Sequence, residues 1–228
     1  MKEINPSITK DVILPVDYWE NEFREGWKNG LYPNPYLLDF LKKYELQIGP
    51  KILDVGSGDG RHLLPLARLG YQATGLELTE AGIMASEQKL NSFSAQVKLI
   101  KGDFHNIPFV NESFDSVISI QALHYNNWSG ACQSFSEIIR VLKTTGLFFF
   151  RARSDKGHWR LSDQQIIDKG ITRVENRNTG FTVMVHDYTL EELQELAAAN
   201  KAKIIQAIDD DYSGKPGEWN VIFKKIRK

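Results

Sequence analysis

The chain has 228 residues, a length that fits one globular domain. Its 28 Lys and Arg residues against 29 Asp and Glu residues give a formal net charge of −1, which argues against a dedicated nucleic-acid binder because such proteins usually carry a basic excess. Hydrophobic residues at 42% and charged residues at 25% exclude the intrinsically disordered class.

The apolar segments and the cysteine content indicate in which cellular compartment the protein is expected. Apolar runs such as 117–120 and 147–150 are far shorter than the roughly 20 residues that span a bilayer, so we expect no membrane contact. The N-terminal residues lack the apolar core of a signal peptide. A single cysteine, Cys132, excludes an internal disulfide and a Cys-based zinc site. We therefore expect a cytoplasmic protein.

The N-terminal segment carries signals for two helices. A carboxylate at Asp17 with Glu three residues later is a capping box, and the helix it opens places Trp19, Phe23 and Trp27 on one face. The breaker at Asn34-Pro35 begins a second helix, with Asn as N-cap and Pro at the first helical position. The aromatic face either anchors the first helix or covers a bound acceptor molecule.

From residue 50 onward predicted strands alternate with predicted helices. Four such steps joined by short loops indicate a parallel sheet with helices on both faces, and the turn Thr145-Gly146 precedes the fifth strand. The predicted strands are Lys51–Val55, Tyr71–Leu78, Val97–Lys101, Ser113–Ile120 and Leu147–Arg153, and the predicted helices are Arg61–Leu69, Thr79–Leu90 and Gly130–Leu142.

The C-terminal third is less regular. Residues 154–170 are predicted as a polar loop or short helix, and the segments 172–175 and 182–186 as a small hairpin. A capping box at 189–192 opens a helix that ends at Asn200. The two last strands, 204–208 and 219–223, are joined by so short a loop that they must be antiparallel.

The segment ILDVGSGDGRH, residues 52–62, is the most informative in the chain. Gly56, Gly58 and Gly60 allow a tight turn and a close approach of a ligand to a helix N-terminus. A nicotinamide-dinucleotide fingerprint needs glycine where this chain has Arg61. Asp54, at the strand end, repels a pyrophosphate and attracts an ammonium or sulfonium. The turn therefore favours a cationic nucleoside over a dinucleotide, with a loop that holds no ligand as the alternative.

Two further carboxylates follow the next two strands. Glu77 ends the second strand and can accept both hydroxyls of a ribose. Asp103 and Phe104 follow the third strand and can hold an adenine by its amino edge and its face. Each alone is compatible with a surface Glu, a turn Asp or a core Phe. Three carboxylates at the carboxyl ends of consecutive parallel strands indicate one ligand site.

These segments together resemble the class I S-adenosylmethionine-dependent methyltransferases. The resemblance rests on ILDVGSGDGRH, GLELTEAGI, KGDFHNIPFVNESFD, FDSVISIQALHYN and SEIIRVLKTTGLFFF. It implies an α/β fold, a Rossmann-like three-layer sandwich whose seven-stranded, mostly parallel sheet has the order 3-2-1-4-5-7-6 with strand 7 antiparallel. It also implies one domain over 1–228, divided into an N-terminal helical cap (1–45), a cofactor-binding half (50–153), an insertion (154–186) and a C-terminal helix with hairpin strands (187–228).

The resemblance implies S-adenosyl-L-methionine as the cofactor, no metal, and a set of site residues. The residues implied to bind the cofactor are Asp54, Gly56, Ser57, Gly58, Gly60, Glu77, Leu78, Asp103, Phe104 and Gln121. The N-terminal segment looks like the cap of the small-molecule methyltransferases related to the tellurite-resistance and thiopurine enzymes, which implies acceptor contacts by Tyr18, Trp19 and Tyr32.

The implied reaction is methyl transfer to a small-molecule acceptor by in-line displacement. His124 and Tyr125, after the fourth strand, are the candidate catalytic residues. A base is needed for a hydroxyl or phenol acceptor and is dispensable for a thiol anion, a selenide or an amine. Cys132 lies in a predicted helix and is expected in the core. The basic residues Arg151, Arg153, Lys156 and Arg160 form either a solvated loop face or an anion-attracting patch.

Three other functions stay open at this point. They are a non-catalytic S-adenosylmethionine-binding module, a protein or RNA methyltransferase, and, more remotely, an NAD(P)-dependent reductase. We expect a monomer or a homodimer, with a small molecule as the partner and with nucleic acid disfavoured.

Overall fold

The computed structural model describes residues 15–26, 32–157, 166–168, 171–175, 182–210, 214 and 217–227. Trp27 and Arg160, and the connection between the two predicted hairpin strands, lie outside the described residues. Among the helices that are described, none has the length and apolar character needed to cross a membrane.

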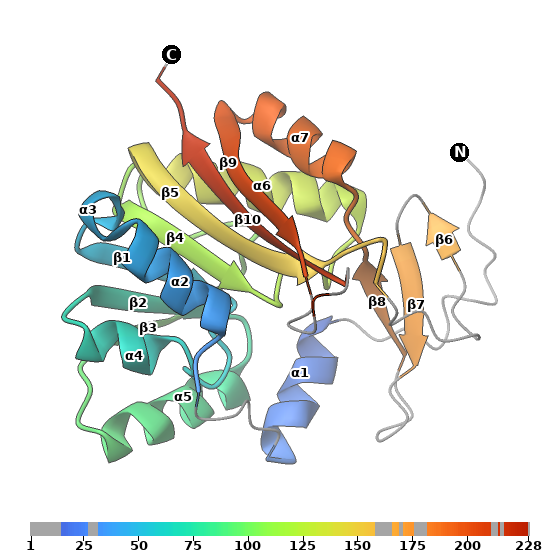
Figure 1. Cartoon of the computed structure of the whole chain (residues 1–228). Coiled ribbons are helices and arrows are strands. Elements are labelled where there is room, and N and C mark those ends of the chain that lie inside the picture. Colours follow the sequence, from blue (N-terminus) through green and yellow to red (C-terminus); the bar gives the residue numbers. More distant parts are fainter. Residues whose placement is uncertain are drawn as a thin grey trace.

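A seven-stranded sheet of the order β3-β2-β1-β4-β5-β10-β9 forms the centre of the molecule (Figure 1). β10 runs antiparallel to β5 and β9, whereas the strands from β3 to β5 pair in parallel. With β9 and β10 as the sixth and seventh strands, the predicted order is confirmed. The strands are β1 (Lys51–Val55), β2 (Gln72–Glu77), β3 (Lys98–Lys101), β4 (Phe114–Ile120), β5 (Leu142–Arg153), β9 (Ala202–Asp209) and β10 (Glu218–Lys225).

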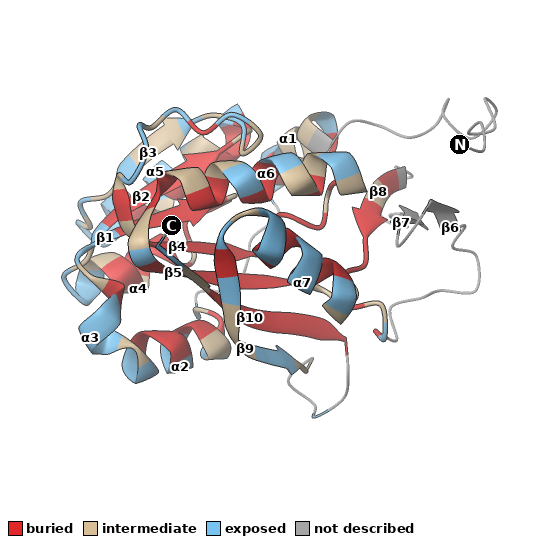
Figure 2. Cartoon of the chain, turned by 90° about the horizontal axis from the view of Figure 1, so that it is seen from above, coloured by how far each residue is buried: buried red, intermediate tan, exposed pale blue. Residues whose placement is uncertain are grey.

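Helices cover both faces of the sheet, which gives the predicted three layers. Apolar side chains of α2, α3, α4 and α5 pack on one face, and those of α6 and α7 on the other. Figure 2 shows their buried sides turned to the sheet and their exposed sides turned outward. The helices are α2 (Pro35–Lys43), α3 (Glu45–Ile48), α4 (Leu63–Arg68), α5 (Glu80–Ser92), α6 (Trp128–Val141) and α7 (Leu190–Ala199).

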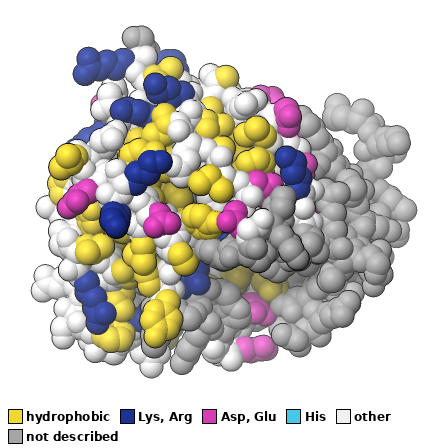
Figure 3. Space-filling view, in the orientation of Figure 1, with side chains coloured by type: hydrophobic (Ala, Val, Ile, Leu, Met, Phe, Trp, Pro, Cys, Tyr) yellow, Lys and Arg dark blue, Asp and Glu magenta, His cyan; other side chains and the backbone are white. Residues whose placement is uncertain are grey.

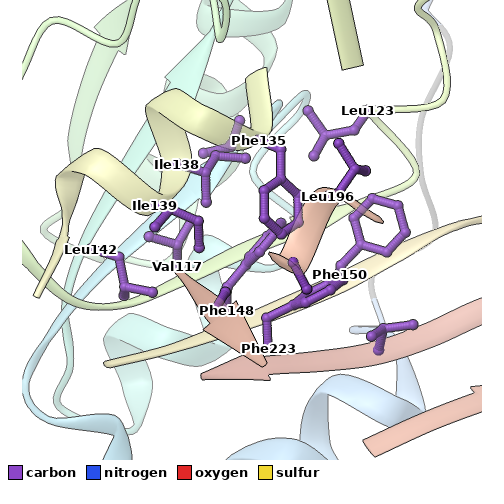
Figure 4. Packing of buried hydrophobic residues seen from close by; sticks show 14 of the residues in the cluster. Val117, Leu123, Phe135, Ile138, Ile139, Leu142, Phe148, Phe150, Leu196 and Phe223 are labelled. Atoms are coloured by element: carbon purple, nitrogen blue, oxygen red, sulfur yellow. The ribbon is translucent and has the colours of Figure 1, made fainter. Parts of the chain in front are cut away.

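The central strands are apolar on both faces because both faces are covered. Phe148 and Phe150 of β5 meet Phe135 of α6 and Phe223 of β10 (Figure 4). On the opposite face of β5, Phe149 stacks on Phe40 of α2, with ring centroids 5.2 Å apart. The LFFF run is therefore a strand that alternates between two cores.

A further helix and a second sheet lie beyond the carboxyl ends of β4 and β5 (Figure 1). The helix is α1 (Pro15–Arg24), and the sheet has the order β6-β7-β8 with strands β6 (Ile166–Asp168), β7 (Ile171–Glu175) and β8 (Thr182–His186). The antiparallel pairing of β7 with β8 confirms the predicted hairpin strands. β6 is a strand within the segment predicted as a polar loop or short helix.

Several predicted element boundaries were wrong. α1 begins at Pro15, so Asp17 lies in its first turn and is not the N-cap; proline is compatible with the first helical position, and the carboxylate still favours the helix dipole. α4 begins at Leu63 instead of Arg61. α6 begins at Trp128, because the Asn127 side chain accepts a hydrogen bond from the Gly130 amide and caps the helix there.

The predicted turn Thr145-Gly146 lies inside β5. β5 begins at Leu142, and Thr145 adopts a φ of 70°. Leu142 pairs with Phe114 and Leu147 with Ser116, so β5 has extra residues opposite β4 at this point. The turn signal therefore marks an irregularity within the strand. The caps at Asn34, Thr79 and Thr189 agree with the sequence, and Thr189 with Glu192 forms the predicted capping box.

Candidate ligand site at the carboxyl end of the sheet

The glycine turn after β1 needs glycine at each of its three positions. Gly56, Gly58 and Gly60 have φ values of 74°, 54° and 76°, in the region that favours glycine. A Cβ at Gly56 would lie 2.3 Å from the Ala122 side chain, and a Cβ at Gly60 would lie 2.3 Å from Ser86 Oγ. The turn is thus packed tightly between the loop that joins β4 to α6 and helix α5.

Asp54 is the most unusual side chain of this region. It is fully buried at the end of β1, and neither carboxylate oxygen has a hydrogen-bond partner within the described part of the chain. Burial raises the pKa of Asp54 to about 7; the Arg61 guanidinium opposes this shift and the Glu77 carboxylate adds to it. Burying a carboxylate without a hydrogen-bond donor costs free energy. A cationic group that supplied donors to Asp54 would remove this cost, so such a group should bind strongly here.

Glu77 is buried as well and holds the glycine turn against α5. One carboxylate oxygen accepts a hydrogen bond from the Gly58 amide at 2.9 Å. The other accepts from the Thr79 amide at 3.0 Å and from the Thr79 hydroxyl at 2.7 Å. Glu77, which was predicted to bind a ribose, therefore already organises two loops. Its oxygen that faces Gly58 accepts one hydrogen bond within the described residues and has the capacity to accept another.

Asp103 and Phe104 lie after β3, as predicted, but Asp103 does not stand alone. One of its oxygens accepts from the His105 amide at 2.8 Å and lies 2.7 Å from His105 Nδ1. Phe104 is half-buried, and its ring centroid is 4.7 Å from that of His105. His105 is a residue of this site that the sequence reasoning missed, although it belongs to the quoted segment KGDFHNIPF.

Leu78 and Gln121 complete the predicted cofactor set. Leu78 is half-buried between Glu77 and the N-cap of α5. Gln121 is exposed, has a φ of 59°, and donates from Nε2 to the Glu218 carboxylate at 2.6 Å. Its side chain is thereby directed toward β10. Ser57 is buried, and its Oγ has no hydrogen-bond partner within the described residues.

His124 and Tyr125 follow β4 at the same edge of the sheet. His124 is buried, and burial together with the nearby Arg153 lowers its pKa to about 3. Burial, reinforced by Tyr18, raises the pKa of Tyr125. Both side chains are therefore neutral near pH 7, so the imidazole is a weak proton acceptor in this environment. The His124 carbonyl accepts a hydrogen bond from the His186 amide of β8 at 2.7 Å.

α1 brings two of the three predicted acceptor residues onto this loop. Trp19 lies with its ring centroid 5.1 Å from that of Tyr125, and Tyr18 lies 6.5 Å from it. With Val183 and Val185 of β8 these rings form one apolar group, which we call the aromatic cluster: Tyr18, Trp19, Tyr125, Val183 and Val185. Tyr32 is 85% exposed and is not part of it.

α1 also covers the glycine turn. A Cβ at Gly58 would lie 3.3 Å from the ring of Phe23, so the helix packs directly on the turn. Glu20 accepts a hydrogen bond from the Ala81 amide at 3.2 Å, in the first turn of α5. The aromatic face predicted for this helix therefore contacts both the glycine turn and the loop after β4.

The basic residues of β5 correct another expectation. Arg151 is fully buried and pairs with the Glu218 carboxylate and the Asn220 side chain, and Arg153 pairs with the buried Asp187 at 2.8 Å. Neither side chain belongs to a solvated loop face, because both project from a strand that is covered on both sides.

Cys132 is half-buried on α6 against the main core, and burial raises the pKa of its thiol.

Comparison with known families places the glycine turn and its neighbours in a known domain. A family model described as a methyltransferase domain matches residues 52–146. A sterol 24-C-methyltransferase of Gibberella zeae is 39% identical over 107 residues, which are 44% of this chain and 27% of that protein. A fatty-acid O-methyltransferase of Mycolicibacterium smegmatis is 28% identical over 163 residues, which are 64% of this chain and 57% of that protein.

The chain therefore spans between about a quarter and somewhat more than half of the length of these two relatives. Among solved structures, an S-adenosylmethionine-dependent methyltransferase of Methanosarcina mazei aligns with a TM-score of 0.69 and 20% identity. The alignment covers 86% of this chain and all of that chain. At this identity the likeness concerns the fold, and it covers more of the chain than the segment 52–146 that the family model matches.

Proposed function

We propose that this chain, which belongs over residues 52–146 to the class I S-adenosylmethionine-dependent methyltransferase family, transfers a methyl group from S-adenosylmethionine to a small-molecule acceptor. The observation that carries the proposal is the buried Asp54 carboxylate, which has no donor among the described residues and lies beside three glycines at a strand end. This arrangement suits a cation that brings its own hydrogen-bond donors. It does not suit the pyrophosphate of a dinucleotide.

The residues present fit this cofactor. The two Asp54 oxygens, which have no hydrogen-bond partner among the described residues, suit its ammonium group, and the tight glycine turn beside them suits close approach of its methionine part to the backbone. Glu77 has hydrogen-bonding capacity for a ribose hydroxyl, and Asp103 with Phe104 and Leu78 suits an adenine. When bound, the cofactor supplies an electrophilic methyl group together with its leaving group.

The chain itself would orient the reactants and exclude water. Phe23 over Gly58 and Trp19 against Tyr125 close the site from the side of α1. His124 is neutral and weakly basic, and Tyr125 retains its proton. These groups can position an acceptor but are poor at ionising one, which favours an accepting atom that is nucleophilic without a base.

We propose an apolar acceptor in particular. The aromatic cluster supports this, because its rings and aliphatic side chains come from three elements that converge beside His124. The names of two relatives point the same way, since they act on a sterol and on a fatty acid. A carboxylate or thiolate on an apolar body would need no base and would match both features.

The charge distribution on one face of the molecule supports a small-molecule acceptor over a nucleic acid. On the face shown in Figure 3, Lys and Arg side chains are interspersed with Asp, Glu and hydrophobic ones, whereas nucleic-acid binders present a continuous basic stripe. We also propose a cytoplasmic location, because a chain with a single cysteine has no internal disulfide of the kind common in secreted proteins.

A thermal-unfolding panel tests the cofactor. S-adenosylmethionine and S-adenosylhomocysteine at about one hundred times their Kd should stabilise the chain by about 2.7 kcal/mol, a rise in Tm on the order of 5–10 °C for this length. NAD and NADP should have no effect. Stabilisation by NAD or NADP alone would overturn the proposal in favour of a reductase.

Methyl transfer is then measured with isotopically labelled cofactor over medium-chain fatty acids, phenols, aliphatic thiols and amines. Transfer to an apolar carboxylate or thiol is expected. Cofactor binding without transfer to any small molecule, combined with labelling of protein or RNA, would contradict the small-molecule acceptor. Binding with no labelling of any kind would support the non-catalytic module.

A further inference from the structure

His105 connects two loops that carry different parts of the site. Its Nδ1 lies 2.7 Å from Asp103 Oδ1, in the loop after β3 to which His105 itself belongs. Its Nε2 lies 3.2 Å from Asn126 Oδ1, in the loop between β4 and α6. Asn126 follows Tyr125 directly in the sequence. The imidazole therefore stands between the carboxylate proposed for adenine and the loop proposed to face the acceptor.

Hydrogen-bond chemistry defines what the ring does there. A carboxylate oxygen only accepts. Asn126 Oδ1 also acts as an acceptor, because it accepts the Asn127 amide at 3.1 Å while the amide nitrogen of the same side chain donates to Ser134 at 3.2 Å. Both ring nitrogens of His105 thus face acceptor oxygens. A neutral imidazole has one N–H, so the ring bridges the loops by one hydrogen bond and one close contact, and the tautomer sets which loop receives the hydrogen bond.

Gly130 makes room for this bridge. A Cβ at that position would lie 1.9 Å from Asn126 Oδ1 and 2.8 Å from His105 Nε2. Glycine near the start of α6 is otherwise unfavourable for helix stability, so the close approach gives it a structural reason. A second contact holds the same segment, since Gln133 of α6 donates to the His105 carbonyl at 2.9 Å.

We propose that His105 is a positioning residue that couples occupancy of the adenine side of the site to the placement of the acceptor loop. The inference rests on the proposed function, because it takes Asp103 as the carboxylate that binds the base. An adenine bound by Asp103 would be connected through His105 to Asn126. It would therefore also be placed relative to His124 and Tyr125, which belong to the same loop as Asn126. Loss of the ring frees both loops at once.

The test compares His105→Ala and His105→Gln with the matched control Asn106→Ala. Asn106 is exposed, adjacent in the chain, and its side chain makes no hydrogen bond that involves a described residue. We expect His105→Ala to raise the KM for S-adenosylmethionine about tenfold and to lower kcat about tenfold, because hydrogen bonds to charged groups have effects of this order. His105→Gln, which retains one donor, should recover part of both losses, and Asn106→Ala should change neither.

A second measurement separates positioning from general destabilisation. In a double-mutant cycle with Asp103→Asn, the effects of His105→Ala and Asp103→Asn on kcat/KM should be strongly non-additive, because His105→Ala removes the contact that Asp103→Asn weakens by removing its charge. Circular dichroism and urea unfolding establish that the variants fold; if His105→Ala does not, His105→Gln carries the comparison.

The outcomes are distinguishable from failure of the proposed function. If the unaltered chain binds no S-adenosylmethionine, the proposed function and this inference both fail. If the chain binds and transfers normally while His105→Ala and His105→Gln keep kcat and KM within twofold, only the coupling role is overturned. Additive effects with Asp103→Asn would also overturn it.

Discussion

At the scale of single residues, Asp54 has an electrostatic cost in the absence of a ligand. Its carboxylate is fully buried and lacks a donor among the described residues, and burial raises its pKa from 3.8 to about 7. The folded chain therefore holds a proton at Asp54 more tightly than the unfolded chain does. Between about pH 4 and pH 7 this group lowers the free energy of unfolding as pH rises, by on the order of 4 kcal/mol in full.

The variant Asp54→Asn should separate stability from binding. Without cofactor, the variant should lose the decline in unfolding free energy between pH 5 and pH 8, because an amide does not titrate. Its affinity for S-adenosylmethionine should fall at least tenfold, and the rise of affinity with pH expected for the unaltered chain should disappear. Urea unfolding and isothermal titration calorimetry at both pH values measure these effects.

The matched control is Asp39→Asn, which changes an exposed carboxylate on α2. This variant should behave like the unaltered chain. Equal cofactor affinity in Asp54→Asn and Asp39→Asn would refute the proposed role of Asp54.

His124 is a residue whose environment limits its chemistry. Burial and Arg153 lower its pKa to about 3, so it does not change charge between pH 5 and pH 9. The general-base role stays a hypothesis, and this environment argues for a positioning role in its place.

We predict that His124→Gln reduces kcat no more than about tenfold and leaves the pH profile of kcat/KM unchanged between pH 5 and pH 9. Steady-state kinetics over that range provide the check. A limb of the profile that is present in the unaltered chain and vanishes in His124→Gln would instead identify His124 as a base whose pKa rises on acceptor binding.

At the scale of elements, α1 connects the glycine turn to the loop between β4 and α6. Phe23 packs on Gly58, Glu20 accepts from the amide of Ala81 at the start of α5, and Trp19 contacts Tyr125. These contacts join one short helix to three separate loops. The ring of Phe23 is the contact between α1 and the glycine turn, so its truncation should loosen the helix there while the central sheet stays folded.

Phe23→Ala should free α1 from the glycine turn. We expect faster amide hydrogen exchange in residues 15–26, a cofactor affinity reduced about tenfold, and little change in exchange within β4 and β5, because their cores do not include this ring. The control Glu25→Ala changes an exposed residue of the same segment and should leave exchange and affinity unaltered. Unchanged exchange in α1 after Phe23→Ala would contradict this view of the helix.

At the scale of the whole molecule, buried charges connect the C-terminal strands to the rest of the sheet. Arg151 of β5 pairs with Glu218 of β10, and Glu218 also accepts from Gln121 at the end of β4. Arg151 is fully buried and Glu218 nearly so. Removing one partner therefore leaves the other as a buried charge without its counterion, which destabilises the fold.

Arg151→Met should therefore lower the free energy of unfolding by about 3–5 kcal/mol. The double variant Arg151→Met with Glu218→Leu should lose less than Arg151→Met alone, because no uncompensated carboxylate remains. Urea unfolding of the three proteins decides the matter. A double variant less stable than the single one would show that the pair contributes more than it costs to bury.

The order of the strands was implied by the family resemblance. The buried strands, the position of the glycine turn and the caps of α2, α5 and α7 could be predicted from the residues themselves. These features depend on local patterns: apolar runs for strands covered on both faces, glycines where φ must be positive, and side-chain oxygens that bind helix amides. The exact starts of α1, α4 and β5 were missed because proline, asparagine and a strand irregularity shift boundaries by a few residues without changing the pattern.

What only the tertiary structure decided is where side chains distant in sequence meet. The contact of His105 with Asn126, the packing of Phe23 on Gly58 and the burial of Arg151 against Glu218 join residues from different elements. No local pattern encodes such contacts, because they depend on how far one element lies from another once the core has packed. The sequence by itself determined the strands of the sheet, the glycine turn and the carboxylates at the strand ends, because these follow from local patterns. Packing between elements decided the neighbours, the charge states and the covering of the loop after β4 by α1.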